Sequence, residues 1–162
     1  MKTLYLLRHA KSSWDYNVED RNRPLQAKGI RRIQKVAQAQ RSAWKSLDAL
    51  FSSPANRAMH TAVIAATQAD FPMSKIQLAT ELYSFDAQAV LHFIYDLPKA
   101  LNTVLLVGHN PAFTSVANHL GADSCPELKT ASWACITFAE TEWGSISNGT
   151  LNWVITSKED ER

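Results

Sequence analysis

Short runs of apolar residues alternate along the chain with longer segments in which apolar positions recur at helical spacing. Four of the runs are expected to be strands: residues 4–7, 49–51, 76–79 and 104–107. Three of the longer segments are expected to be helices: residues 26–41, 56–67 and 87–95. Because the runs are continuous rather than alternating with polar residues, we expect strands that are covered on both faces, as in a parallel sheet between two layers of helices.

The segment that follows residue 107 carries the clearest helix signals. Asn110 can cap a helix, and Pro111 fits a first turn, where a missing amide hydrogen costs nothing. Residues 113–120 then carry apolar side chains in the i, i+3, i+4, i+7 pattern, and Gly121 stands where a helix commonly ends. The segment therefore predicts a helix that ends at Gly121.

Beyond residue 121 the pattern changes to two further strands, at 133–138 and 151–155. Asn148 and Gly149, directly before the second of them, are typical of a tight hairpin turn. We expect these two strands to pair antiparallel at the edge of the sheet. The predicted fold class is thus a three-layer α/β/α sandwich with a mainly parallel central sheet and an antiparallel C-terminal hairpin at its edge.

Composition supports a single globular domain. The chain has 162 residues, of which 46% are hydrophobic and 20% charged, so we expect residues 1–162 to form one domain with a sizeable core. The net charge of +2 is too small for a general nucleic-acid binder. Two cysteines, Cys125 and Cys135, are too few for a disulfide framework and fit a reducing cytosol.

The apolar runs are too short for membrane insertion. None approaches the ~20 residues that span a bilayer, and the apolar start of the chain is interrupted by Arg8 too soon for a signal peptide. We therefore expect a cytoplasmic protein with no nucleic-acid or membrane partner. The charged residues 158–162 are expected to be a solvated end.

The candidate catalytic and binding residues directly follow the predicted strands. They are Arg8 and His9 after the first strand, Arg57 in the first turn of the next helix, Glu81 after the third strand and His109 after the fourth. In an open α/β sheet, ligands bind beyond the carboxyl ends of the strands. Arginine binds phosphate oxygens in pairs, and a neutral imidazole is a competent nucleophile near pH 7. The pattern therefore predicts a phosphate pocket at this edge of the sheet.

Four blocks of sequence resemble, in order, the motifs of one protein family. They are residues 7–14 (LRHAKSSW), 23–29 (RPLQAKG), 52–58 (SSPANRA) and 107–111 (VGHNP). Together they resemble the histidine phosphatase superfamily, the phosphoglycerate mutase-like proteins, over roughly the whole chain. The small size and the opening motif resemble the SixA-type phosphohistidine phosphatases. Gln26 departs from the pattern, because it stands where the family usually has threonine or serine before the first helix, which weakens the helix cap.

The resemblance implies a role for each matching residue. His9 would be the nucleophile and become transiently phosphorylated, while Arg8, Arg57 and His109 would bind the phosphate, with His109 as a hydrogen-bond donor. It implies no metal and no organic cofactor. Four neighbouring residues are candidates for the rim of the pocket: Lys11, Ser12, Trp14 and Arg23. Alternatively, Lys11, Ser12 and Arg23 belong to a solvated loop with no role in binding.

Chain length helps to choose a substrate. Larger members of the family insert a cap domain in the interval between Arg57 and His109 to enclose a small metabolite, whereas here a helix, a strand and a helix already fill that interval. An open pocket would admit a phosphorylated side chain of another protein, such as a phosphohistidine-carrying domain. Phosphohistidine can be protonated on its ring and leave as neutral imidazole, but an alkoxide needs a proton donor. Glu81 is the best candidate for such a donor, followed by Asp86.

Other functions remain compatible with the same residues. A phosphatase or mutase for a small phosphorylated metabolite is one, although a mutase must shield its intermediate from water and no cap is expected here. A non-catalytic module that binds phosphorylated partners is another. A zinc protein that uses His9 and His109 with a carboxylate is the third.

Overall fold

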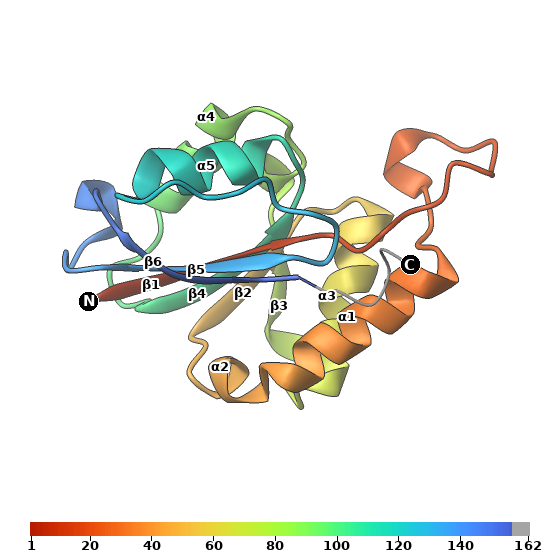
Figure 1. Cartoon of the computed structure of the whole chain (residues 1–162), viewed down its shortest axis with the longest axis horizontal. Helices are drawn as coiled ribbons and strands as arrows, with labels where there is room; N and C mark the ends of the chain where they lie inside the picture. Colours follow the sequence, from red (N-terminus) through yellow and green to blue (C-terminus); the bar gives the residue numbers. More distant parts are fainter. Residues whose placement is uncertain (157–162) are drawn as a thin grey trace.

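A six-stranded sheet runs through the computed structural model, which describes residues 1–156 (Figure 1). Its strands are β1 (Lys2–Arg8), β2 (Ala49–Ser52), β3 (Ile76–Leu78), β4 (Thr103–Gly108), β5 (Trp133–Phe138) and β6 (Thr150–Ile155). They lie in the order β3-β2-β4-β1-β5-β6; the first four are parallel, and β5 and β6 run antiparallel. The predicted sheet is confirmed. The charged end at 158–162 lies outside the described residues.

Helices cover both faces of this sheet. They are α1 (Ala27–Ala39), α2 (Arg41–Lys45), α3 (Asn56–Gln68), α4 (Ala87–Tyr95) and α5 (Ala112–Leu120). Four single turns of 3₁₀ helix lie in the connections between these elements and the strands: η1 (Asp20–Asn22), η2 (Met73–Lys75), η3 (Thr80–Leu82) and η4 (Trp143–Ser145). In Figure 1, α4 and α5 lie on one side of the sheet and α1, α2 and α3 on the other, so the three-layer prediction is confirmed. Within residues 1–156, every helix is too short or too polar to span a lipid bilayer.

The continuous apolar strands bury both of their faces. Along β1, Leu4 and Leu6 belong to the core beneath α4 and α5, while Tyr5 and Leu7 belong to the core beneath the other three helices. Successive side chains of a strand point to opposite faces, so an unbroken apolar run supplies two cores at once. This is why the runs indicated a sheet between two helical layers.

Two local expectations need correction. The predicted helix at 26–41 is divided, because Gln40 leaves the helical conformation between α1 and α2. β5 and β6 do pair antiparallel, but residues 139–149 join them and include η4, so there is no two-residue hairpin turn. Asn148 adopts a positive φ of 48°, which asparagine tolerates better than most residues, within this longer connection.

The predicted helix α5 is confirmed, but its start is shifted by one residue, because Pro111 and not Asn110 occupies the N-cap position. The helix begins at Ala112, directly after Pro111, and the side-chain oxygen of Asn110 accepts the amide of Thr114 at 3.2 Å. Asn110 also donates from its side-chain nitrogen to the carbonyl of Leu128 at 2.7 Å. It therefore ties the start of α5 to the segment before β5, beside the carboxyl ends of β1 and β4.

Candidate active site

The register of β1 and β4 brings the two histidines together. Arg8 is paired with Gly108, so His9 and His109 follow the paired positions on adjacent parallel strands. The backbone amide of His9 donates to the carbonyl of Gly108 at 3.0 Å, and the two imidazole ring centres lie 5.2 Å apart. The sequence placed both residues at strand ends, and the pairing of their strands makes them neighbours.

The segment after β2 adds the next groups. The backbone amide of Ser53 donates to Val107 of β4 at 2.9 Å, and its hydroxyl lies 2.8 Å from Nε2 of His109. Arg57 follows in the first turn of α3, and its side chain is buried. One helical turn later, Thr61 donates to the carbonyl of Arg57 and accepts the backbone amide of Ala10 at 2.9 Å. Thr61 thus fixes α3 to the backbone that follows His9.

His9 is held as a neutral imidazole, and its hydrogen bond decides which ring nitrogen carries the proton. Its Nδ1 lies 2.7 Å from the carbonyl oxygen of Ala10, and because a carbonyl can only accept, the proton belongs on Nδ1. Burial lowers the pKa of His9 to about 3; the hydrogen bond to Ala10 opposes this, and the charges of His109 and the two arginines add to it. Nε2 therefore keeps its lone pair near pH 7, as a nucleophile requires.

His109 is also held neutral. Burial lowers its pKa to about 4, helped by the charge of Arg57 and opposed by that of Asp20. The Ser53 hydroxyl accepts the amide of Ala55 at 3.2 Å, which leaves its own proton free to go to Nε2 of His109. In that arrangement Nδ1 carries the remaining ring proton, and Nδ1 has no partner among the described residues.

Acid is expected to destabilise the protein between pH 7 and pH 5 through these two histidines. The folded protein keeps both neutral, whereas the unfolded chain takes up protons below about pH 6.5, so the unfolded state binds more protons in this window. Each histidine lowers the unfolding free energy by up to about 2 kcal/mol at pH 5. Urea unfolding at several pH values measures the effect.

A His9→Gln/His109→Gln double variant is the control for that measurement. It should show a clearly shallower loss of stability from pH 7 to pH 5, and an equal loss would contradict the assignment. Asp20 does not interfere with this measurement. Its pKa is lowered to about 2, so the stability that it contributes is still present at pH 5 and is lost only as the pH falls below about 4.

A cavity of about 360 Å³ opens beside His9 at the ends of the parallel strands. Its lining consists of Arg8, His9, Lys11, Ser12, Trp14, Asp20, Arg23, Gln26, Arg57, Phe85, Asn110 and Thr130. Four basic side chains thus face a single carboxylate. The Nε atoms of Arg8 and Arg57 are buried without a partner among the described residues, although buried donors are normally paired. An oxyanion offers acceptors to both guanidinium groups, so the lining fits a phosphate.

The structure brings together nearly all of the predicted site residues. Arg8, His9 and Arg57 line the cavity, and so do the four rim candidates. His109 is not among the residues that line the cavity; it is buried, and its ring packs beside that of His9. Gln26 precedes α1 without capping it and donates instead to the carbonyl of Ser12 at 3.1 Å. The weakened cap expected from this residue is confirmed.

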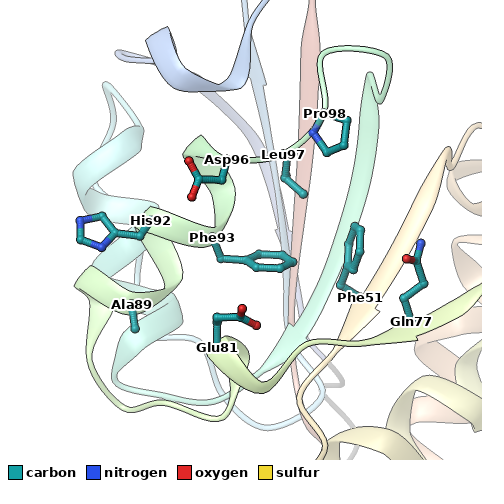
Figure 2. A pocket seen from close by; sticks show the side chains of 9 residues that line it. All are labelled: Phe51, Gln77, Glu81, Ala89, His92, Phe93, Asp96, Leu97 and Pro98. Atoms are coloured by element: carbon teal, nitrogen blue, oxygen red, sulfur yellow. The ribbon is translucent and has the colours of Figure 1, made fainter.

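Glu81 is not brought into this cavity. It lies in η3 and lines a second cavity of about 420 Å³, together with Phe51 and Phe93 (Figure 2). Asp86 caps α4, where it accepts the amide of Gln88 at 3.0 Å. The expectation that either carboxylate donates a proton at the phosphate site is thus not supported by their positions. Two other residues of this segment reach the site: Phe85 lines the cavity, and the ring centre of Tyr83 lies 5.4 Å from that of His109.

Sequence reasoning missed Asp20, which organises one wall of the cavity. Arg57 donates to its carboxylate at 3.0 Å and to its backbone carbonyl at 2.8 Å. The Tyr83 hydroxyl donates to the same carboxylate at 2.6 Å, and Arg23 donates to it at 3.2 Å. The opposite charges of Asp20 and Arg23, three residues apart, were the one signal available in the sequence.

No metal-binding cluster accompanies these residues. Within residues 1–156, no three histidine, cysteine, aspartate or glutamate side chains gather closely enough to hold a metal ion. The polar groups that line the cavity are guanidinium, ammonium, imidazole, hydroxyl and amide groups and a single carboxylate. This donor set suits an oxyanion.

Comparison with known proteins gives one family match and several structural likenesses. The family model of the histidine phosphatase superfamily, branch 1, matches residues 4–90. A chloroplastic protein of Arabidopsis thaliana, the uncharacterized At3g52155, is 31% identical over 152 residues, which cover 88% of this chain and 69% of that protein.

Solved structures share the fold. The protein histidine phosphatase SixA in complex with tungstate is 24% identical, with a TM-score of 0.81 over 95% of this chain and 96% of that one. A mycobacterial glucosyl-3-phosphoglycerate phosphatase is 16% identical, with a TM-score of 0.69 over 97% of this chain and 100% of that one. At these identities the likenesses establish the architecture.

Proposed function

The chain belongs to the histidine phosphatase superfamily, and from this premise we propose that it hydrolyses protein phosphohistidine through a phospho-His9 intermediate. The observation that carries the proposal is His9 itself: a buried, neutral imidazole with its proton on Nδ1, beside two arginines whose Nε atoms are buried without an acceptor among the described residues. This arrangement supplies a nucleophile and charge neutralisation for the phosphoryl group, which are the main requirements of phosphoryl transfer.

The proposed reaction has two steps. Nε2 of His9 forms a bond to phosphorus as the bond from phosphorus to the substrate's ring nitrogen breaks, and the departing ring takes that electron pair. Arg8 and Arg57 hold the phosphoryl oxygens, and Nδ1 of His109 donates to one of them. Water then attacks phospho-His9, the N–P bond returns its electrons to Nε2, and inorganic phosphate leaves.

The absence of an acid in the cavity lining supports phosphohistidine as substrate. Asp20 is the one carboxylate of the lining, and although partial burial raises its pKa, hydrogen bonds from Tyr83 and Arg57 lower it to about 2. Asp20 therefore carries no proton to give near pH 7. A phosphohistidine that is already protonated on its ring needs none, whereas an alkoxide leaving group does.

A small phosphorylated metabolite is the second candidate substrate. The cavity volume of about 360 Å³ falls within the range of small-molecule sites. The mycobacterial glucosyl-3-phosphoglycerate phosphatase, whose name gives a small phosphorylated metabolite as its substrate, has a similar fold.

A panel of substrates tests the proposal. We expect release of inorganic phosphate from a histidine-phosphorylated protein with kcat/KM at least about tenfold above that for phosphoserine peptide, 3-phosphoglycerate or glucose 6-phosphate. A higher kcat/KM for one of the esters would favour the second candidate. Isomerisation of phosphoglycerate without release of phosphate would indicate a mutase. If no substrate is turned over, a non-catalytic binding module is indicated. Loss of activity in the presence of a strong chelator would indicate the zinc protein.

A further inference from the structure

The cavity has a buried floor and an exposed mouth. Arg57, at the floor, is 2% exposed. At the mouth, Trp14 is 76% exposed, Phe85 54%, and the side chain of Asp20 41%. These three residues come from two segments, one between β1 and α1 and the other between η3 and α4. The former segment extends beyond the carboxyl end of β1 (Figure 1).

The geometry of in-line displacement determines which part of the substrate lies at the mouth of the cavity. The leaving group departs on the side of phosphorus opposite the nucleophile. Because His9 lies buried at the floor, the leaving group points toward the mouth. The same direction is required if the phosphorylated ring remains attached to another protein, whose backbone stays outside the cavity.

Asp20 has acceptor capacity left at this position. Its carboxylate accepts from Arg57 of α3, from Tyr83 after η3 and from Arg23 after η1. A carboxylate offers about four acceptor sites, so one more N–H can bind. With its pKa lowered to about 2, Asp20 stays negatively charged and cannot act as an acid.

Two aromatic rings accompany this charge. Trp14 and Phe85 both line the cavity, and Phe85 meets the ring of His109 with its centre 5.7 Å away. The guanidinium of Arg23 lies 3.2 Å from the centre of the Trp14 ring, so Trp14 already stacks against one planar cation. Its high exposure leaves surface for another, since indole and phenyl rings attract cations and planar rings.

We propose that Asp20, Trp14 and Phe85 form a leaving-group subsite that binds the protonated imidazole ring of the substrate. The inference rests on the proposed function and adds to it the residues that select phosphohistidine over phosphate esters. Asp20 accepts the N–H of the ring, and the aromatic rings hold its faces. As the N–P bond breaks, its electron pair goes to the ring nitrogen, and the ring departs neutral with its other nitrogen still protonated.

The same subsite disfavours other leaving groups. A fixed carboxylate repels the negative charge that develops on an alkoxide or phenolate oxygen, whereas it stabilises an imidazolium until phosphorus has left. The remaining charged side chains of the lining, Arg8, Lys11, Arg23 and Arg57, are all positive. Asp20 is therefore the one charged side chain of the lining that attracts a cationic ring.

An Asp20→Asn variant tests the subsite. Asparagine keeps the size of the side chain but removes the charge, so kcat/KM for a phosphohistidine protein should fall about ten- to hundredfold more than kcat/KM for p-nitrophenyl phosphate. Nitrophenolate leaves without a proton, so this ester reports any displacement of Arg57 alone. Activity of the unaltered protein on phosphohistidine should decline as the pH rises and the substrate ring loses its proton. In the variant this decline should occur at lower pH.

The control is Glu19→Gln, which removes one negative charge from the neighbouring exposed residue outside the cavity lining. It should leave the ratio of the two kcat/KM values and the pH profile unchanged. If Asp20→Asn lowers both substrates equally and leaves the pH decline in place, Asp20 only positions Arg57 and the subsite is wrong.

A second variant covers the case in which Asp20→Asn fails to fold. Trp14→Ala/Phe85→Ala alters two exposed side chains and should also lower kcat/KM for phosphohistidine selectively, about tenfold or more. An unchanged ratio would overturn the subsite. The proposed function has a separate test: it fails if the unaltered protein does not hydrolyse phosphohistidine. If the unaltered protein does hydrolyse it, and every variant keeps the same preference for phosphohistidine over p-nitrophenyl phosphate, only the subsite is wrong.

Discussion

Replacing His9 with alanine is expected to abolish phosphate release while leaving the fold and phosphate binding in place. The substitution removes the nitrogen that we propose as the nucleophile, but Arg8 and Arg57 keep their positions because their hydrogen bonds go to Leu128 and Asp20. Loss of a nucleophile that acts with its neighbours as a unit costs on the order of 10⁴-fold in turnover or more. Steady-state release of inorganic phosphate measures the loss, and calorimetry with phosphate measures the retained binding.

The intermediate gives the same prediction a second readout. Brief reaction with a ³²P-labelled substrate should leave acid-labile label on the unaltered protein and none on His9→Ala. His119→Ala is the matched control, because His119 is an exposed histidine on α5 outside the cavity lining. Turnover by His9→Ala within about a tenth of the original rate would show that another group attacks phosphorus.

The position of His9 could be predicted because it depends on local signals. A buried apolar run predicts a strand, the carboxyl end of a parallel strand predicts a site, and the residue there is read directly from the sequence. That His9 and His109 are neighbours depends in addition on the pairing of β1 with β4, which are about a hundred residues apart in sequence. No local sequence pattern encodes the pairing of β1 with β4. It could be expected only from the resemblance of the ordered motifs to a known family.

Glu81 shows where local reasoning stops. A residue after a strand lies at the right edge of the sheet, but the direction of its side chain depends on the turn that follows. Here η3 directs Glu81 to the cavity beside α4, and Tyr83, two residues later, reaches Asp20 instead. Asp20 was missed for a related reason, because its role arises from contacts with Arg57 and Tyr83, which are distant in sequence.

Replacing Arg57 with alanine is expected to lower kcat/KM by about 10³–10⁵, the range measured for arginines that stabilise phosphoryl transfer. Arg57 is buried at the floor of the cavity and its Nε lacks an acceptor, so it is placed to neutralise charge on the phosphoryl oxygens. Arg57→Lys keeps a positive charge but cannot reach the carbonyl and carboxylate of Asp20 and a phosphate at the same time. It should therefore recover only a small part of the lost rate, measured with p-nitrophenyl phosphate so that the leaving group needs no proton.

Stability must be separated from catalysis in this case, because Arg57 also binds Asp20. Arg41→Ala is a suitable comparison, since Arg41 on α2 forms an exposed ion pair with Asp70, which follows α3, and neither residue lines the cavity. This variant should leave kcat/KM unchanged. Thermal unfolding of each variant shows how much folded protein is present at the assay temperature. If folded Arg57→Ala retains kcat/KM within about tenfold of the original, the charge of Arg57 does not act on the phosphoryl group, and its burial serves only to hold Asp20 and the loop before α1. A large loss in a fully folded variant, with little rescue by lysine, requires that the planar guanidinium binds the phosphoryl oxygens while Asp20 holds it in place.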